Sequence, residues 1–447
     1  LDRRFDPIRD RNSFSGICVE VSSSPDAAMS DRRVSMNRTD TIFALSSGKL
    51  PSGVAAFRLS GARVRFVLET ICGFVPENRV MRRVSMKDPT GGLIDRGLCV
   101  YFAAPGSFTG EDSAELHVHG SIAVAKKLAE VLSVIEGVRA ADAGEFTKRA
   151  FLNGKIDLAE AEGLSDLIQA ETDLQRRLAL SQADGNLSVV FSRWRERLVH
   201  CRAMVEAAID FAEEADVAHA ALKSVQADIG LLNEEIRSWL KRSANSEMIR
   251  DGFKVVIIGA PNAGKSSLLN GLAGRDVAII SDEPGTTRDL IDVRLELAGN
   301  LVIVTDTAGI RTDAGKVETI GIGKAVGRAE QADLVVLLED ASAPVRADIG
   351  LPAIRSLRVG NKSDLGVLNK DDYDILISAK TGDGIAALVS KIAGLASVSN
   401  GVVEGIVVQQ RQKSLLVDCC RELDSCLLHA GETELVAEHL RLAGNYV

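Results

Sequence analysis

The sequence of 447 residues has no long hydrophobic run, because none approaches the ~18–20 apolar residues of a membrane-spanning helix. Its seven cysteines form no Cys-x-x-Cys pair, which argues against a zinc site or a disulfide framework and favours reduced thiols in a cytosolic protein. Positive charge is not in excess either. The formal net charge of −9 argues against binding nucleic acid through a broad basic surface, although it is compatible with a local patch. No internal period indicates a repeat protein.

The first ~35 residues lack the apolar segment that a signal peptide needs. They begin with Leu1, alternate Arg with Asp, and contain the run Ser22–Pro25. Met29 and Met36 are alternative starting points. We therefore expect residues 1–38 to be a disordered extension that is separate from the folded protein.

The rest of the chain divides by hydrophobic pattern. Strand patterns at 41–44, 54–57, 98–102 and 114–118, with helical spacing over 122–135, predict an α/β unit over 39–153. Apolar residues then recur at helical spacing from about 156 to 246, where the stretch 178–209 fits one long helix or two. A helical period restarts at Leu416, Cys420, Leu423 and Leu427. We expect this stripe to pack against the helices that precede residue 251, so that the segment between them is inserted into a helical domain.

A phosphate-binding loop is indicated by Gly259–Ser266 (GAPNAGKS). The loop follows the apolar run Val255–Ile258 and precedes a helical pattern, so backbone N–H groups and a helix N-terminus can face a phosphate. Lys265 would reach the β- and γ-phosphates, and the Ser266 hydroxyl would bind Mg²⁺. By itself this loop leaves ATP and GTP open.

The base is indicated by Asn361–Asp364 (NKSD), which follows a predicted strand at 357–359. The Asp364 carboxylate can accept hydrogen bonds from the guanine N1–H and the N2 amino group, a pair that adenine cannot supply. The Lys362 stem can lie along the base, and Ser378–Lys380 can offer a backbone N–H to O6. The alternative for Asn361–Asp364 is a plain turn, but its order and its distance from the phosphate loop favour a guanine site.

Two further motifs suit the γ-phosphate. Asp306–Gly309 (DTAG) ends an apolar strand, and Asp306 can hold Mg²⁺ through water while the Gly309 N–H senses the γ-phosphate. Gly285–Asp289 (GTTRD) supplies Thr287 as a second Mg²⁺ hydroxyl.

Two residues suggest an unusual mechanism of hydrolysis. Ile310 stands where many GTPases place a glutamine that orients water, and an apolar side chain cannot do so. The Asn262 amide oxygen can coordinate a monovalent cation beside the phosphates, which would supply the charge that an arginine finger provides elsewhere.

These residues resemble the tRNA modification GTPases of the MnmE (TrmE) family, within the TrmE-Era-like GTPases. The resemblance covers about residues 39–447. It rests on the Asn262 loop, on Gly285–Asp289 and Ile310, and on three segments: Ser107–Asp112 (SFTGED), Gly144–Lys155 (GEFTKRAFLNGK) and Glu318–Ile322 (ETIGI).

The resemblance implies an α/β and α fold with a P-loop, Ras-like G domain inserted in a helical domain. The implied domains are a folate-binding and dimerisation domain at 39–153, helical segments at 154–250 and 399–447, and a G domain at 251–398. It implies a cytoplasmic, potassium-activated homodimer that works with the flavoprotein MnmG in a hetero-tetramer. The pair adds a carboxymethylaminomethyl group to C5 of the wobble uridine of certain tRNAs, with a 5-formyl or methylene tetrahydrofolate as the one-carbon donor.

The resemblance also implies the site residues. GTP would be bound by Asn262, Ala263, Gly264, Lys265, Ser266, Ser267, Ser281, Thr286, Thr287, Asp306, Thr307, Ala308, Gly309, Asn361, Lys362, Asp364, Ser378, Ala379 and Lys380. The implied Mg²⁺ ligands are Ser266 and Thr287, and the implied K⁺ ligands are Asn262, Ser281, Glu283 and Thr286. Catalysis falls to Glu318, Asn262 and Lys265, with Glu318 orienting the attacking water; alone, Glu318 would be a solvated charge on a loop.

Folate binding falls to Arg58, Glu115 and Lys155. Arg58 and Lys155 suit the folate carboxylates, and Glu115 suits the pterin amino groups, although each alone would be an ordinary surface charge. His117 and His119 alternate on a strand like a metal pair, but two ligands without a third make a metal site a minor alternative.

Family members usually end in Cys-Ile-Gly-Lys, whereas this sequence stops at Asn445–Val447. We therefore expect GTP hydrolysis to be supported, while the modification step is in question for the chain as given. Two other functions stay open. A GTP-regulated RNA-binding or ribosome-assembly factor would fit the nucleotide motifs, but the sequence shows no RNP motif, no KH-type loop and no basic tail. A folate-binding scaffold with a dead nucleotide site is disfavoured by Lys265, Asp306 and Asp364.

Overall fold

The computed structural model describes residues 40–210, 215–275, 277–279, 292–306, 331–344, 355–397 and 409–447, with the backbone alone for residues 215–221, 244, 245 and 306. The expected extension at 1–38 lies outside these residues. The chain divides into two compact units, residues 1–161 and 162–447.

The first unit is built on a six-stranded sheet with the order β3-β4-β5-β2-β1-β6. Neighbouring strands are antiparallel except β1 and β6, which are parallel. Its elements are β1 (Thr41–Leu45), β2 (Val54–Ser60), α1 (Val64–Cys72), β3 (Arg82–Lys87), β4 (Leu93–Phe102), β5 (Ser113–His119), α2 (Ile122–Ser133), β6 (Val138–Ala140) and α3 (Glu145–Leu152).

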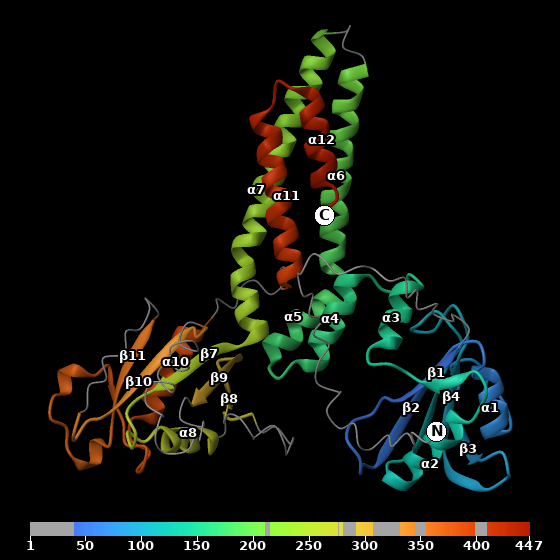
Figure 1. The fold of residues 1–447 in the computed structure, drawn as a ribbon, viewed down its shortest axis with the longest axis horizontal. Coiled ribbons are helices and arrows are strands. Elements are labelled where there is room, and N and C mark those ends of the chain that lie inside the picture. The colour runs from blue at the N-terminus through green and yellow to red at the C-terminus, as the bar shows by residue number, and fades with distance from the viewer. Residues whose placement is uncertain are drawn as a thin grey trace, which may run out of the picture. The chain divides into compact units, whose positions relative to one another are not determined.

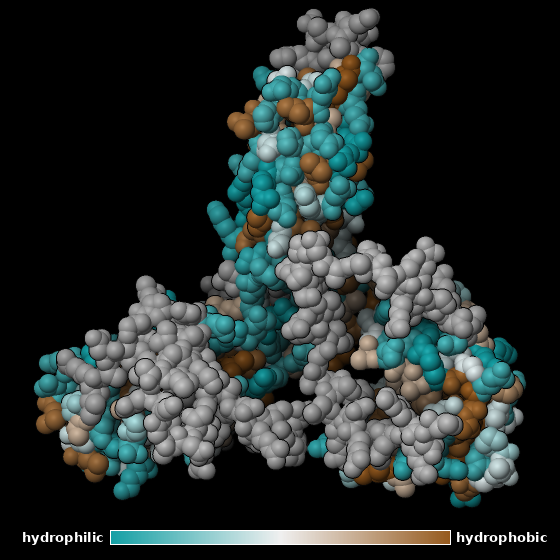
Figure 2. All heavy atoms as spheres, viewed as in Figure 1, coloured by the Kyte–Doolittle hydropathy of each residue, from teal (hydrophilic) through white to brown (hydrophobic). Residues whose placement is uncertain are grey.

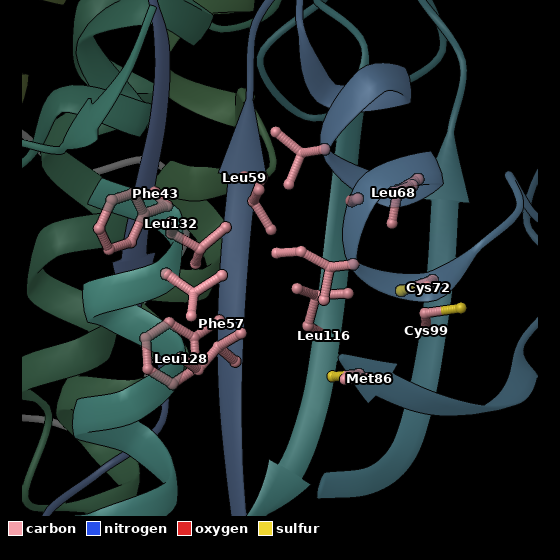
Figure 3. Close-up of a cluster of buried hydrophobic side chains, with 14 of the residues drawn as sticks. Phe43, Phe57, Leu59, Leu68, Cys72, Met86, Cys99, Leu116, Leu128 and Leu132 are labelled. Atoms are coloured by element: carbon pink, nitrogen blue, oxygen red, sulfur yellow. The ribbon is translucent and has the colours of Figure 1, made fainter. Parts of the chain in front are cut away.

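Helices α1 and α2 cover one face of this sheet. Their apolar residues share a single core with inward-facing strand residues, and Figure 3 shows Leu68 of α1 and Leu128 of α2 pointing toward it. Strand residues alternate between faces, so Phe57 and Leu59 enter the core while Arg58 lies on the opposite face. The face away from α1 and α2 therefore carries the polar residues of β2 and β5.

The second unit contains a six-stranded sheet with the order β12-β11-β10-β7-β9-β8. Its strands are parallel except for the antiparallel pair β8 and β9. Its elements are β7 (Phe253–Ile258), α8 (Lys265–Ala273), β8 (Asp292–Leu297), β9 (Asn300–Asp306), β10 (Leu334–Asp340), β11 (Ser356–Asn361), β12 (Ile375–Leu376) and α10 (Ile385–Ala396), with short 3₁₀ turns at Ser363–Leu365 and Lys370–Asp372. Parallel strands read as nearly continuous apolar runs, which is how β7 was recognised from the sequence.

The helical part of the second unit combines chain segments from both sides of this sheet. It contains α4 (Leu158–Gln169), which begins in the first unit, α5 (Asp173–Ala183), α6 (Asn186–Asp210), α7 (Ala215–Asp251), α11 (Gln410–Leu428) and α12 (Thr433–Ala443). Helix α11 packs on α7 and α12 packs on α6, as Figure 1 shows. Asn233 Nδ2 of α7 donates to Asp424 Oδ1 of α11 at 2.7 Å. The expected packing of the last helical segment on the earlier helices is confirmed for Leu416, Cys420 and Leu423, which are buried, whereas Leu427 of the expected stripe is 38% exposed.

The side of this bundle that faces the viewer in Figure 2 is mostly hydrophilic, with hydrophobic residues scattered singly. None of the helices in the described part of the chain is long and apolar enough to cross a membrane.

The stretch 178–209 forms two helices, α5 and α6, rather than one. The break falls near Gly185, which has a φ of +79°. A residue in the left-handed region interrupts an α-helix, and glycine adopts it at little cost.

Candidate functional site

The phosphate loop joins the end of β7 to the start of α8. The buried Lys265 side chain curls back over the loop, and its Nζ donates to the carbonyls of Gly259 at 2.7 Å and Ala260 at 3.0 Å. Asn262 and Gly264 have φ values of +66° and +96°, which turn the backbone tightly around this ammonium group. The first turn of α8 thus begins where a phosphate would meet a helix N-terminus.

Asn361 ties the phosphate loop to the two loops expected to bind the base. Its side chain is 2% exposed, and its Nδ2 donates to the carbonyl of Ala263 at 2.7 Å. Its Oδ1 accepts from the backbone N–H of Lys362 at 2.8 Å and of Ala379 at 2.9 Å. A Cβ added to Gly264 would lie 2.2 Å from Asn361 Nδ2, so this close approach needs a glycine.

Asp364 and Ser378 are also brought together. The buried Ser378 hydroxyl donates to Asp364 Oδ1 at 2.7 Å, while the Asp364 residue itself is exposed. This bond fixes the direction of a carboxylate that stays accessible to a ligand. Because Ala379 N–H already donates to Asn361, a guanine O6 would share this N–H or take that of Lys380.

Asp340, at the end of β10, was not identified from the sequence. Its Oδ2 lies 2.6 Å from Lys362 Nζ, and its Oδ1 accepts from the Ser342 hydroxyl at 2.6 Å. Burial raises the pKa of Asp340, but the bonds from Lys362 and Ser342 outweigh it and hold that pKa below its usual value. The Lys362 side chain is therefore held by its end, with its stem free to support a base.

Several expected residues lie outside the described part of the chain: Ser281, Glu283, Thr286, Thr287, Thr307, Ala308, Gly309, Ile310 and Glu318. Asp306 ends β9, and its backbone is in register with Ile257 of β7. The carboxyl ends of parallel strands meet at one edge of a sheet, so Asp306 lies at the same edge as the phosphate loop. Ser266 and Ser267 are exposed in the first turn of α8.

A second polar group lies on the open face of the first unit. Arg58 Nη2 donates to Glu115 Oε1 at 2.9 Å, and His117 Nε2 lies 3.2 Å from Glu115 Oε2. Burial raises the pKa of Glu115, but His117 and Arg58 outweigh it and lower that pKa, which keeps the carboxylate charged. A charged acceptor of this kind suits amino groups such as those of a pterin.

Lys155 is exposed just beyond α3. A Cβ added to Gly110 would lie 3.2 Å from Lys155 Cγ and Cδ, so the Lys155 stem lies against that glycine. His119 bonds Asp95, with 2.9 Å between Nδ1 and Oδ1. Among the described residues, no group of three or more His, Cys, Asp or Glu side chains is arranged to hold a metal ion.

Comparison with known proteins gives two family matches. Residues 41–155 match the family model described as the GTP-binding protein TrmE N-terminus, and residues 158–447 match that of the MnmE helical domain. A tRNA modification GTPase MnmE of Brucella anthropi is 48% identical over 410 residues, which cover 91% of this chain and 93% of the relative. The protein of the same name from Brucella abortus strain 2308 is 48% identical over 412 residues, with the same coverage.

Among solved structures, the G domain of the T. maritima FeoB iron transporter is 22% identical. The match covers 32% of this chain and 99% of the FeoB chain, with a TM-score of 0.26.

Proposed function

The chain belongs to the MnmE family of tRNA modification GTPases, and on that premise we propose that it binds and hydrolyses GTP to modify the wobble uridine of certain tRNAs. GTP binding is supported best by the three hydrogen bonds that the buried Asn361 side chain makes. They join the phosphate loop to both base loops, so one side chain assembles the site. A buried amide with all three partners satisfied is costly to disturb.

In this proposal the protein binds GTP through five groups. When GTP binds, Lys265 Nζ would exchange its bonds to the loop carbonyls for bonds to the β- and γ-phosphates. The backbone N–H groups from Asn262 to Ser267 would surround these phosphates. Asp364, oriented by Ser378, accepts the guanine N1–H and N2 amino group. Thr307, Ala308 and Gly309 would contact the γ-phosphate, and Lys362 would support the base.

Metal ions complete the phosphate site. Ser266 and Thr287 would hold Mg²⁺ with Asp306 behind a water, and the ion neutralises charge on the phosphates when bound. Asn262 is exposed and has a φ of +66°, and its amide oxygen suits K⁺. Ser281, Glu283 and Thr286 would complete that site. Glu318 would orient the attacking water, the role for which Ile310 is unsuited.

The modification part rests on the family and on the first unit. Arg58, Glu115 and Lys155 would bind a tetrahydrofolate derivative as a one-carbon donor. We infer that the chain acts in the cytoplasm as a homodimer together with the flavoprotein MnmG, and that tRNA is the shared substrate.

Modification in cells tests the function. In cells that lack their own enzyme of this family, the chain is tested as given and with a C-terminal Cys-Ile-Gly-Lys segment added. We expect the form with that segment to restore the modified wobble uridine, measured by mass spectrometry of tRNA nucleosides. Lys265→Ala should fail at equal expression, because its ammonium group is needed for the phosphates. Restoration by Lys265→Ala would show that modification does not need the nucleotide. No modified uridine from a chain that hydrolyses GTP would point instead to a GTP-regulated assembly factor.

Glu318→Ala tests the hydrolytic role. We expect GTP affinity to be retained and most turnover to be lost, the pattern of a group that acts in the transition state. The neighbouring Thr319→Ala serves as a control and should keep its turnover. Weaker GTP binding with normal turnover of the bound nucleotide would remove Glu318 from the mechanism.

A further inference from the structure

A buried hydroxyl cluster adjoins the Arg58–Glu115 pair. It consists of Ser60, Thr109 and Ser113, which are 0%, 1% and 7% exposed. Ser60 Oγ and Thr109 Oγ1 are 2.7 Å apart, and Thr109 Oγ1 and Ser113 Oγ are 3.2 Å apart. In the register of β2 and β5, Ser60 faces Ser113 and Arg58 faces Glu115. Ser60 and Ser113 therefore lie on the same face of the sheet as Arg58 and Glu115, two residues further along the strands. Through Thr109, the cluster anchors the Ser107–Asp112 loop beside the Arg58–Glu115 pair.

Glu111 connects this loop to helix α3. Its Oε2 accepts from the Ser60 hydroxyl at 2.7 Å and from Arg149 Nη1 at 3.0 Å. Arg149 also donates to Glu145 Oε1 at 3.0 Å and to the backbone carbonyl of Asp40 at 2.9 Å. One guanidinium group therefore joins the loop, α3 and the chain that enters β1.

This buried arrangement fixes geometry as well as adding stability. The Arg149 side chain is 11% exposed and that of Glu145 is 4% exposed. Breaking one partner of such a buried pair is costly, whereas apolar residues of similar volume in place of the whole pair could be equally stable, so what the ion pair adds is the fixed direction of its bonds.

Lys155 follows α3 and contacts the same Ser107–Asp112 loop. Asn153 Nδ2 donates to the carbonyl of Thr109 at 2.7 Å, and the Lys155 stem lies against Gly110. Gly110 has a φ of +78°, so this residue resists replacement by a side chain that would push the stem away. The position of Lys155 thus depends on the loop that Arg149 holds through Glu111.

We propose that Arg149 is a positioning residue for the folate site: through Glu111 it holds the Ser107–Asp112 loop so that Lys155 stays in place beside the Arg58–Glu115 pair. This rests on the proposed binding of folate to Arg58, Glu115 and Lys155. Arg149 acts through the loop and through α3, without contact with the ligand.

Binding of 5-formyltetrahydrofolate to the full chain, measured by isothermal titration calorimetry, gives the first readout. Arg149→Met should weaken binding about tenfold to a hundredfold, because Lys155 loses its fixed position. Glu111→Gln keeps the shape but weakens the bond to Arg149, and should weaken binding less. Arg82→Met is the matched control, since this arginine of the same unit is 55% exposed and lies 3.7 Å from Glu77. It should bind as the wild type does.

Amide hydrogen exchange gives a second readout that needs no folate. In both variants exchange should rise in residues 107–112 and 150–156 and stay unchanged in β4 and α2, whereas a general loss of stability would raise it throughout the unit. Unchanged exchange in these two segments, or unchanged affinity in a folded variant, overturns the proposal. If Arg149→Met does not fold, Glu111→Gln decides. If the wild type binds no folate, the proposed folate site fails, and exchange alone decides whether Arg149 positions the Lys155 segment.

Discussion

Single residues in the second unit explain how a guanine base would be chosen. The Asp364 carboxylate is exposed to a ligand and oriented by the buried Ser378 hydroxyl at 2.7 Å. Once a bound base covers it, a carboxylate left without its donors would disfavour the wrong base more strongly than a lost contact would. We therefore expect the selectivity to depend on the charge of Asp364 and on its direction.

Asp364→Asn should reverse the base preference. An amide offers a donor where the guanine N1–H and N2 amino group need acceptors, so GDP affinity should fall by about a hundredfold or more while xanthosine diphosphate gains. Titration of both nucleotides by calorimetry measures this. Ser378→Ala loses the orienting bond alone and should show a smaller loss without a change of preference. An unchanged preference for guanine in Asp364→Asn would remove this account of base recognition.

Glu145 makes the stability of the first unit depend on pH. Burial raises its pKa, but Arg139, the N–H of Asp142 and Arg149 outweigh this and lower the pKa from 4.5 to about 2. Such a depression corresponds to about 3 kcal/mol of stabilisation. Because the folded-state pKa lies below the usual one, this stabilisation is present in full above pH 4.5 and is lost as the pH falls toward 2.

Glu145→Gln should therefore cost on the order of 3 kcal/mol at neutral pH, and its difference from the wild type should shrink as the pH falls below 4.5. Thiol labelling of the fully buried Cys99 during urea unfolding reports on this unit. The exposed Glu69→Gln on α1 is the control and should change stability by less than about 0.5 kcal/mol. A difference for Glu145→Gln that is constant with pH would contradict the assigned cause.

At the scale of elements, the nucleotide site depends on how closely two loops approach. Gly264 permits the contact because its φ is +96° and because a Cβ there would lie 2.2 Å from Asn361 Nδ2. Gly264→Ala should thus separate the phosphate loop from the base loops and lower GDP affinity about tenfold or more, measured by calorimetry. Gly271→Ala within α8 is the matched control, since its Cβ would meet Ile385 Cδ1 at an ordinary 3.4 Å. Equal affinities in the two variants would rule out this role for the contact.

Some of the elements could be predicted from the sequence and others could not. Strand β7, the phosphate loop and α8 were predictable, because a buried apolar strand, a glycine-rich turn and a helical period follow each other without a gap. Strand β3 was not, because this edge strand has only two buried apolar residues, Val84 and Met86, and the exposed Arg82 stands at the third position of their face.

Pairs that are distant in sequence were also out of reach. Asp340 and Lys362 meet because β10 and β11 are parallel neighbours in register, which puts Asp340 beside Asn361. No local pattern carries this information. The same holds for Arg149 and Glu111, whose ion pair joins residues 38 positions apart. The roles assigned to Glu318, Thr287 and Glu283 stay predictions, since these residues lie outside the described part of the chain.

On the scale of the whole molecule, one carboxylate joins the two ends of the inserted nucleotide domain. Asp166 of α4 accepts from Arg250 Nε at 3.2 Å, where α7 leads into β7, and from Gln409 Nε2 at 3.1 Å, just before α11. Burial raises the pKa of Asp166, and Arg250 opposes this in part. Entry and exit are thus bonded to the same side chain of the helical domain. This explains how a sheet-based domain is inserted without separating α7 from α11.

The central claim is that this nucleotide domain hydrolyses GTP with a potassium ion in the place of an arginine finger. The most direct test is the rate of GTP hydrolysis by the full chain in K⁺ and in Na⁺ at equal ionic strength, with Asn262→Ala measured alongside. We predict that K⁺ accelerates turnover at least about tenfold over Na⁺, and that Asn262→Ala removes most of this difference, because a cation held beside the phosphates stabilises charge that develops in the transition state. Equal rates in the two ions would contradict the account.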